Sequence, residues 1–323
     1  MVLHCENGKH QLIKSRNLRV CSFYAGWLHV NNIINTSDVP RQDADSCRRA
    51  LNQLINRAMP DKEQQERLLS DMEAALDKNI IPFEHFDWVR LDERAAFWLW
   101  GHLYQDTDFT LGIPSPSGPG YNGMNWYKRN ELPHAPGSHQ ERANIIIYFF
   151  DNIIFAAPQM NHRSHQILDS LKDQWKIIYN KPLPLKWLPN EEDAVLWAWN
   201  NLQKVQGDKV GYIDRIYKSL KAPELTSWFT PLNHAERNLA LRAALDLWDD
   251  APDTKRLFLL NLNKAWNQQK LRQSRTDKKA LNTYLKNETK RRLDFIAKRN
   301  EIRISDMLEK LINEHYRKIC DGE

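Results

Sequence analysis

The sequence lacks the features that would place it in several common classes. Its four cysteines form no Cys-x-x-Cys pair, the usual spacing of zinc and redox motifs, and sparse cysteine is typical of a reducing compartment. The N-terminus has no apolar signal stretch. The longest apolar run, Ile145 to Ala157, is interrupted by Asp151-Asn152 and is shorter than the roughly 20 residues that a membrane span needs. We therefore expect a cytoplasmic protein with no membrane association.

Nucleotide-binding and hydrolase motifs are also missing. The chain has no P-loop, no G-x-G-x-x-G and no G-x-S-x-G sequence. Arg129 and His134 have the spacing of the catalytic pair in HEPN-type ribonucleases, but Pro133 lies beside them in an irregular segment, and that family needs the pair on a helix. We expect no catalytic residues and no cofactor. A nuclease-like or toxin-like effector in the N-terminal region is the alternative that this leaves open.

Two groups of side chains could be imagined as metal ligands. His162, His165 and Asp169 would share one face of a helix. The other group consists of His4, Cys5, His10 and Cys21, whose spacing fits no standard zinc knuckle. Residues of these types more often cap and coat helices, and we predict no metal site.

The sequence does contain enough apolar residues for a sizeable core, and its basic residues are concentrated. Hydrophobic residues make up 41% of the 323 positions and include 12 tryptophans, which suits two domains. The net charge is only +5, yet the range Lys264 to Arg303 holds 13 Lys or Arg against 4 acids. A basic segment of this kind favours a polyanionic partner, although a solvated charged helix would look similar.

Helical patterns dominate residues 1–252, which we predict to be one large Trp-rich helical domain. Asp61 is a candidate N-cap, and Ser138 with Glu141 and Asn233 with Glu236 match the capping pattern. Residues 112–137 form a Gly- and Pro-rich irregular loop whose aromatic and basic residues could hold nucleic acid or could be a plain surface insertion. A protein partner or effector at this domain is left open.

Two helical stretches of this domain repeat one another. Glu93 to Leu103 matches Glu192 to Leu202 at a constant offset of 99 residues, including the Trp-x-Trp pair in each. Duplication of a helical unit would explain the match, and so would chance convergence of two Trp-rich core helices.

The C-terminal part predicts a different organisation. A basic connecting helix covers residues 253–277, and the apolar pattern then alternates over Leu281 to Leu285, which is a strand signal. A helix is expected from an N-cap at Asn287, Asn300-Glu301 would end it, and a second helix would begin near Ser305. Residues 278–323 therefore read as strand, helix, turn, helix. Such a unit is too small to bury its apolar faces alone, and a second copy would solve this.

This segment resembles the ribbon-helix-helix DNA-binding superfamily, which includes the Arc and MetJ repressors, many antitoxins and the Ter-macrodomain organiser. The resemblance covers about 45 residues and rests on the strand alternation, the Ala-Lys-Arg-Asn helix end and the sequence Ile302-Arg-Ile-Ser-Asp-Met-Leu308. It implies a mainly α chain that ends in a β-α-α dimerisation and DNA-binding domain. The sequence departs from the family pattern at Ala280, at Arg303 and in the missing turn glycine.

The resemblance also implies roles for individual residues. Asn282 and Tyr284 would face bases in the major groove, and Arg303 and Ser305 would contact a phosphate. Further DNA contacts are expected from Lys270, Arg272, Arg275, Lys279 and Lys286. The implied dimer core consists of Leu281, Leu285, Leu293, Ile296, Met307 and Leu311.

Together these observations predict a homodimeric, sequence-specific protein that binds double-stranded DNA and associates with the nucleoid. Its purpose could be transcription regulation, maintenance of a mobile element or nucleoid organisation, and bacteria are its expected setting. A helical scaffold with a basic tail that binds RNA without sequence preference is a further alternative.

Overall fold

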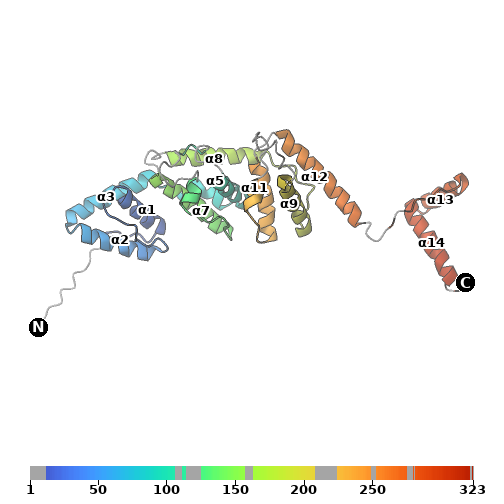
Figure 1. The fold of residues 1–323 in the computed structure, drawn as a ribbon, viewed down its shortest axis with the longest axis horizontal. Helices are drawn as coiled ribbons and strands as arrows, with labels where there is room; N and C mark the ends of the chain where they lie inside the picture. Colours follow the sequence, from blue (N-terminus) through green and yellow to red (C-terminus); the bar gives the residue numbers. More distant parts are fainter. Residues whose placement is uncertain are drawn as a thin grey trace. The chain divides into compact units, whose positions relative to one another are not determined.

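The computed structural model describes residues 12–105, 111–113, 125–156, 163–207, 224–248, 252–274, 279, 281–320 and 322. These residues divide into two compact units, 1–264 and 265–323. Every regular element among them is helical (Figure 1). Unit 1 contains α1 (Leu18–Val30), α2 (Ala44–Ala58), α3 (Lys62–Asn79), η1 (Phe83–Phe86), α4 (Asp87–Arg90), α5 (Glu93–Gln105), α6 (Trp126–Arg129), α7 (His139–Ala156), α8 (Arg163–Asn180), α9 (Glu192–Gly207), α10 (Leu225–Trp228) and α11 (His234–Leu247). The helix α12 (Pro252–Gln273) runs across the division, and unit 2 continues with α13 (Asn287–Arg299) and α14 (Ile304–Cys320).

Side-chain caps explain where several helices of unit 1 begin. Asp61 accepts from the Glu63 amide over 3.3 Å at the start of α3, and Asn233 accepts from the Glu236 amide over 2.9 Å at the start of α11. Each cap satisfies one of the amides that a helix N-terminus leaves without an intrahelical partner. The predicted N-caps at Asp61 and Asn233 are therefore confirmed.

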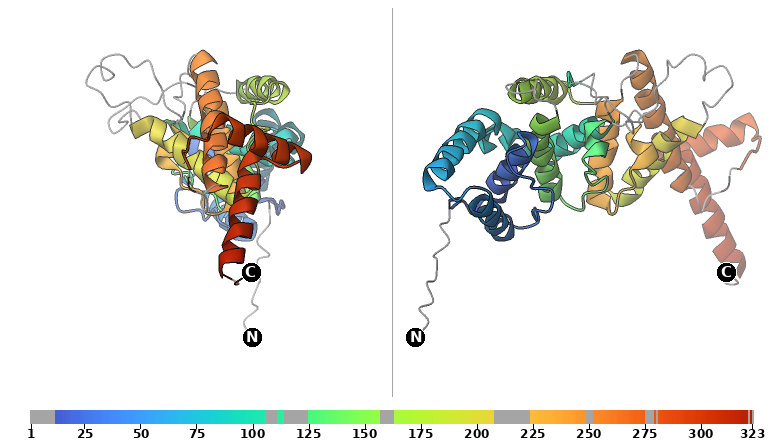
Figure 2. Two further views of the ribbon diagram at one scale, coloured as in Figure 1. Left: turned by 90° about the vertical axis from the view of Figure 1, so that its right-hand side faces the viewer. Right: turned by 60° about the vertical axis from the view of Figure 1, so that its left-hand side comes forward.

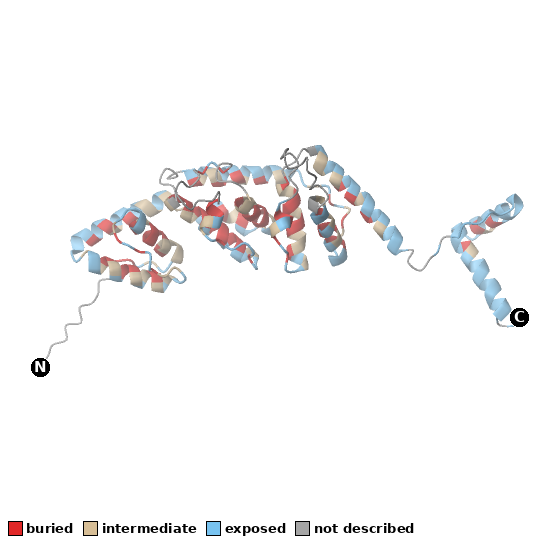
Figure 3. Cartoon of the chain, in the orientation of Figure 1, coloured by how far each residue is buried: buried red, intermediate tan, exposed pale blue. Residues whose placement is uncertain are grey.

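The longer helices of unit 1 pack side by side in a row. α1 packs against α7, α7 against α5, α5 against α11, and α11 against α9 (Figure 1). α8 lies across one side of this row (Figures 1 and 2), where its Trp175 meets Trp98 of α5 with ring centroids 5.6 Å apart. Burial is densest in α5, α7 and α11 (Figure 3). The two Trp-x-Trp helices, α5 and α9, thus flank the same helix, α11.

The helices α7 and α11 begin in the same way. The Ser138 hydroxyl accepts from the Glu141 amide over 3.1 Å, as Asn233 does from Glu236, and each glutamate carboxylate accepts from an amide just before the helix, at 2.8 Å for Glu141 and 2.7 Å for Glu236. In the next position, Nε2 of His139 and of His234 donates to a backbone carbonyl that precedes α5 or α9, respectively. The repetition seen at α5 and α9 therefore extends to their partner helices.

Two bidentate ion pairs join distant parts of unit 1. Arg19 of α1 holds Asp151 of α7 through two hydrogen bonds of 2.5 and 2.6 Å, and Arg94 of α5 holds Asp246 of α11 at 2.7 Å. Burial raises the pKa of both carboxyl groups, and the arginines oppose that rise.

Unit 2 is a helical hairpin with a very small core. Leu293 and Ala297 of α13 and Met307 of α14 are buried together, and Ile296 and Leu308 pack against them. The turn between the helices contains Glu301 with a φ of 55°. Asn300, which precedes Glu301 in the predicted helix end, has a φ of −95°, and its side-chain amide donates to the Ile296 carbonyl.

The predicted strand is wrong. Residues 281–286 form no regular element and are exposed, and no strand occurs in the part of the chain that the structure describes. Alternation says which side chains share a face, but a strand also needs a hydrogen-bonded neighbour, and the described residues contain no second extended segment beside this one. All regular elements of the described residues are therefore helical, and the predicted β-α-α domain is corrected to a two-helix hairpin preceded by an irregular segment. Asn287 is the first residue of α13 and not its cap.

Candidate nucleic-acid interface

The residues expected to read bases lie on the exposed segment before α13. Asn282 and Tyr284 are exposed. The full area of the Tyr284 side chain faces solvent, so its ring makes almost no contact with the described residues. Lys286 closes the segment and directly precedes α13 without a side-chain cap. These side chains are presented to solvent, which a role in binding requires.

Unit 2 exposes cations that none of its described acids neutralises. Lys290 pairs with Asp294 and Arg292 with Glu288 along α13. No ion pair within the described residues involves the exposed side chains Lys286, Arg291, Lys298, Arg299 and Arg303. A partner that carries negative charge would meet five uncompensated positive charges on this small unit.

The other predicted DNA contacts are exposed, except for one that lies outside the described residues. Arg303 and Ser305 are exposed at the start of α14. Lys270 and Arg272 lie on the exposed last turns of α12, and Lys279 is exposed. Arg275 lies outside the described residues.

The implied dimer core separates into two groups. Leu293 and Met307 are buried within the hairpin itself, and Ile296 is half-buried beside them. Leu281, Leu285 and Leu311 are exposed. The first group forms the hairpin's own core, and only the second group is free to meet a second molecule.

An apolar stripe continues along α14 from Leu311 towards the C-terminal end of the helix. Ile312, Tyr316 and Ile319 are 57%, 66% and 68% exposed, and they recur at the three- and four-residue spacing that places side chains on one side of a helix. All three residues are absent from the predicted dimer core, although the same spacing could have identified them from the sequence. The structure places nothing from the described residues over this stripe.

Phe295 is another residue that the sequence predictions missed. It is 64% exposed on α13, on the side opposite Leu293 and Ala297. The positions three and four residues before and after it are Arg291, Arg292, Lys298 and Arg299. An aromatic ring with a cation at every neighbouring helical position could have been recognised from that spacing.

The residues considered for catalysis or metal binding do not form a site. The Arg129 guanidinium lies 4.2 Å from the centroid of the Trp126 ring on α6, and His134 is exposed beyond that helix. Both aromatic residues of α6, Trp126 and Tyr127, are buried, so they belong to the core and not to a nucleic-acid loop. His165 stacks edge-on against His85, and His162 lies outside the described residues. The described residues contain no group of three or more His, Cys, Asp or Glu that could hold a metal ion.

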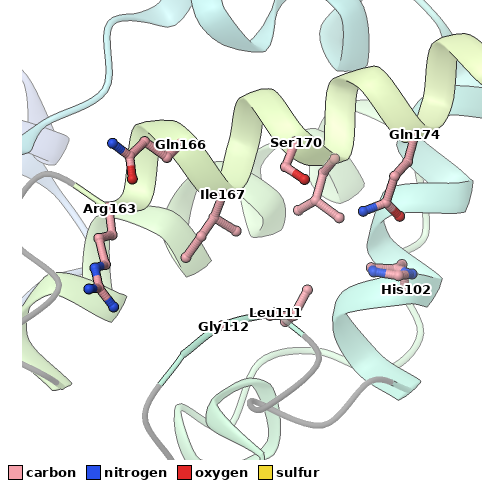
Figure 4. A pocket seen from close by; sticks show the side chains of 9 residues that line it. His102, Leu111, Gly112, Arg163, Gln166, Ile167, Ser170 and Gln174 are labelled. Atoms are coloured by element: carbon pink, nitrogen blue, oxygen red, sulfur yellow. The ribbon is translucent and has the colours of Figure 1, made fainter.

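Unit 1 also has an open groove of about 430 Å³ between α8 and α5 (Figure 4). Gln166, Ser170 and Gln174 project into it from one side of α8, and His102 of α5 lies at one end. The His102 ring is stacked on Trp98, so its position is fixed by the core. The groove is lined by apolar as well as polar side chains, and its lining contains no acid that could pair with Arg163. None of the helices in the described part of the chain is long and apolar enough to cross a membrane.

Comparison with the known protein families, with curated proteins and with solved structures finds no match to this chain.

Proposed function

We propose that this chain is a homodimeric protein that binds double-stranded DNA through its C-terminal unit. The observation that carries the proposal is that unit 2 has a very small core and a long exposed apolar stripe. The same unit exposes cations that make no ion pair within the described residues. Only Leu293, Ala297 and Met307 are buried together, while the two helices hold 13 and 17 residues. Units of fewer than about 40 residues usually need oligomerisation, metals or disulfides to be stable.

A second copy is the partner that this surface favours. Leu311, Ile312, Tyr316 and Ile319 form an apolar stripe on α14, and a two-fold axis would place it against its own copy in an isologous contact. Each hairpin would then contribute to one shared core of four helices. Covering the stripe also removes apolar surface from water, which stabilises the pair by about 25 cal/mol for each Å².

The basic side chains suit the phosphate backbone of DNA. Lys286, Arg291, Lys298, Arg299 and Arg303 are exposed and make no ion pair with described residues. Binding would release counterions from DNA and would weaken as the salt concentration rises. Arg303 and Ser305, at the start of α14, would contact a phosphate together with the first amides of the helix.

Sequence specificity would come from the exposed segment before α13. The Asn282 side chain can form two hydrogen bonds with the N6 and N7 atoms of adenine in the major groove. In a dimer the two segments would approach a pair of related half-sites. A protein of this kind would act as a transcription regulator, a maintenance factor or a nucleoid-associated protein.

The experiment compares Asn282→Ala with Lys286→Ala in the full chain, using fluorescence anisotropy on a selected duplex and on a random duplex. We expect Asn282→Ala to weaken binding to the selected duplex by about 1–3 kcal/mol and to leave the random duplex unaffected. Lys286→Ala should weaken both and should reduce the slope of log K against log salt by about 0.9. Equal losses on both duplexes for both variants would contradict base recognition by this segment.

A further inference from the structure

The outer face of α13 combines an exposed aromatic ring with cationic side chains. Its centre is Phe295, whose ring is 64% exposed. Leu293 and Ala297 point into the hairpin core, and at 100° for each residue Phe295 faces away from them. The ring is therefore held at the solvent side of the helix, where burial in the chain's own core does not explain it.

The four side chains nearest to this ring along the helix are all cationic. Arg291 and Arg292 precede it by four and three residues, and Lys298 and Arg299 follow it by three and four. Residues at these separations are neighbours on a helix surface. Arg292 is paired with Glu288, while Arg291, Lys298 and Arg299 make no ion pair within the described part of the chain. Phe295 therefore has a cationic residue at each of its four neighbouring positions on the helix surface.

We propose that this face of α13 binds single-stranded nucleic acid by stacking an unpaired base on Phe295. Proteins that bind single strands combine cations along the phosphate backbone with aromatic rings on which bases stack. A duplex offers the same phosphates, but its bases are stacked on one another and do not reach an aromatic ring on a helix surface. The presence of the ring therefore selects the single strand over the duplex.

A protein partner is less well matched to the same face. The centres of protein interfaces are apolar and depleted in charged residues, and here the apolar centre is one residue with a cation at each helical neighbour. Because stacking needs only a π-face, the site would accept any base and either sugar. The inference shares Arg291, Lys298 and Arg299 with the duplex binding proposed above, but it rests on Phe295, which duplex binding does not use.

The experiment measures binding of the full chain to a short single strand that contains one 2-aminopurine, whose fluorescence falls when it stacks. The variants are Phe295→Leu, which keeps an apolar side chain without a π-face, and Phe295→Trp, which keeps stacking. Tyr179→Leu is the matched control because Tyr179 is equally exposed but lies on α8 of unit 1. Circular dichroism of each variant checks that the exposed substitutions leave the helices intact.

We expect Phe295→Leu to weaken single-strand binding roughly 5- to 150-fold and to abolish the quenching. Phe295→Trp should keep both, and Tyr179→Leu should match the wild type. DNA and RNA single strands are tested in parallel, and binding of either one supports the site. Equal affinity of Phe295→Leu and wild type would overturn the proposal, as would an equal loss for the corresponding duplex. If Phe295→Leu loses single-strand binding and keeps duplex binding, then single-strand binding through Phe295 and duplex binding through residues 281–286 are separate functions.

Discussion

The Arg142 guanidinium of α7 donates a hydrogen bond to the Glu236 carboxylate of α11 over 3.2 Å, and the two side chains are only 3% and 9% exposed. The guanidinium carbon also lies 4.1 Å from the centroid of the Phe97 ring of α5. Burial lowers the pKa of Arg142, and Glu236 is the largest opposing influence. Residues 94 positions apart in the sequence are therefore joined inside the core of unit 1.

Loss of either member of this pair should strongly destabilise unit 1. We expect Arg142→Met or Glu236→Gln to lower the free energy of unfolding by about 3–5 kcal/mol, because the remaining polar group stays buried without its partner. Urea denaturation followed by circular dichroism measures the change. The double variant Arg142→Met with Glu236→Gln should lose less than the sum of the two single variants. The exposed pair of Arg67 and Glu63 is the control, and an equally small effect at both pairs would contradict the assignment.

Gly26 of α1 should not tolerate even a methyl group. A Cβ atom at this position would lie 2.7 and 2.8 Å from two atoms of the Phe155 ring. We expect Gly26→Ala to cost about 1–3 kcal/mol of stability, although alanine is the better helix former by about 1 kcal/mol. Thermal unfolding measures this, and combination with Phe155→Leu should recover part of the loss. A more stable Gly26→Ala protein would show that α1 and α7 are not in such close contact.

The protein should lose stability at high pH because of its buried tyrosines. Burial, with smaller contributions from Glu73 and Asp77, raises the pKa of Tyr24 to about 12, and burial also raises the pKa of Tyr127. A tyrosine in the unfolded chain ionises near pH 10, so the unfolded state binds fewer protons than the folded state above that pH. The stabilising contribution is complete below pH 10 and is lost as the pH rises towards 12.

Chemical denaturation at a series of alkaline pH values tests this dependence. Tyr24→Phe should unfold as the wild type does at neutral pH and should lose less stability between pH 10 and 12. If both proteins show the same alkaline loss, Tyr24 is not the group responsible.

Two substitutions on α14 should separate dimer formation from folding of the hairpin. Ile312 is exposed on the apolar stripe and Met307 is buried in the hairpin. We expect Ile312→Asp to yield a monomer whose hairpin is less stable to heat, because a charge disrupts the contact between copies that adds to the small core of the hairpin. Met307→Asp should lose helix content as well. Light scattering and circular dichroism measure the two properties, and a wild-type mass for Ile312→Asp would exclude the stripe as the dimer contact.

Local signals in the sequence predicted most helices, because caps and apolar periodicity are local properties. Ser138 and Asn233 both cap the helices that were expected to follow them. Prediction failed at Leu281 to Leu285, where alternation was visible but the presence of a pairing strand is not a local property. It also failed at Tyr127, which lies in the stretch 112–137 that was predicted to be an irregular loop. In the structure its hydroxyl accepts from Trp100 Nε1 over 2.8 Å and donates to the Pro133 carbonyl.

The candidate site was only partly accessible from the sequence for the same reason. The basic character of residues 264–303 was visible in composition, and Asn282 and Tyr284 are exposed in the structure, while their roles stay predictions. The division of the implied dimer core into a buried group and an exposed group depends on how α13 and α14 pack. The outward position of Phe295 likewise follows from which face of α13 that packing buries.

The most direct measurement is selection of bound fragments from a random library of double-stranded DNA, with the full chain and its Ile312→Asp and Asn282→Ala variants. A homodimer that recognises bases through residues 281–286 should enrich a motif of two related half-sites. Ile312→Asp should lose that enrichment, and Asn282→Ala should change or lose the preferred base at one position in each half-site. Enrichment of no motif by the wild type, or of the same motif by all three proteins, would contradict sequence-specific DNA binding by the C-terminal unit.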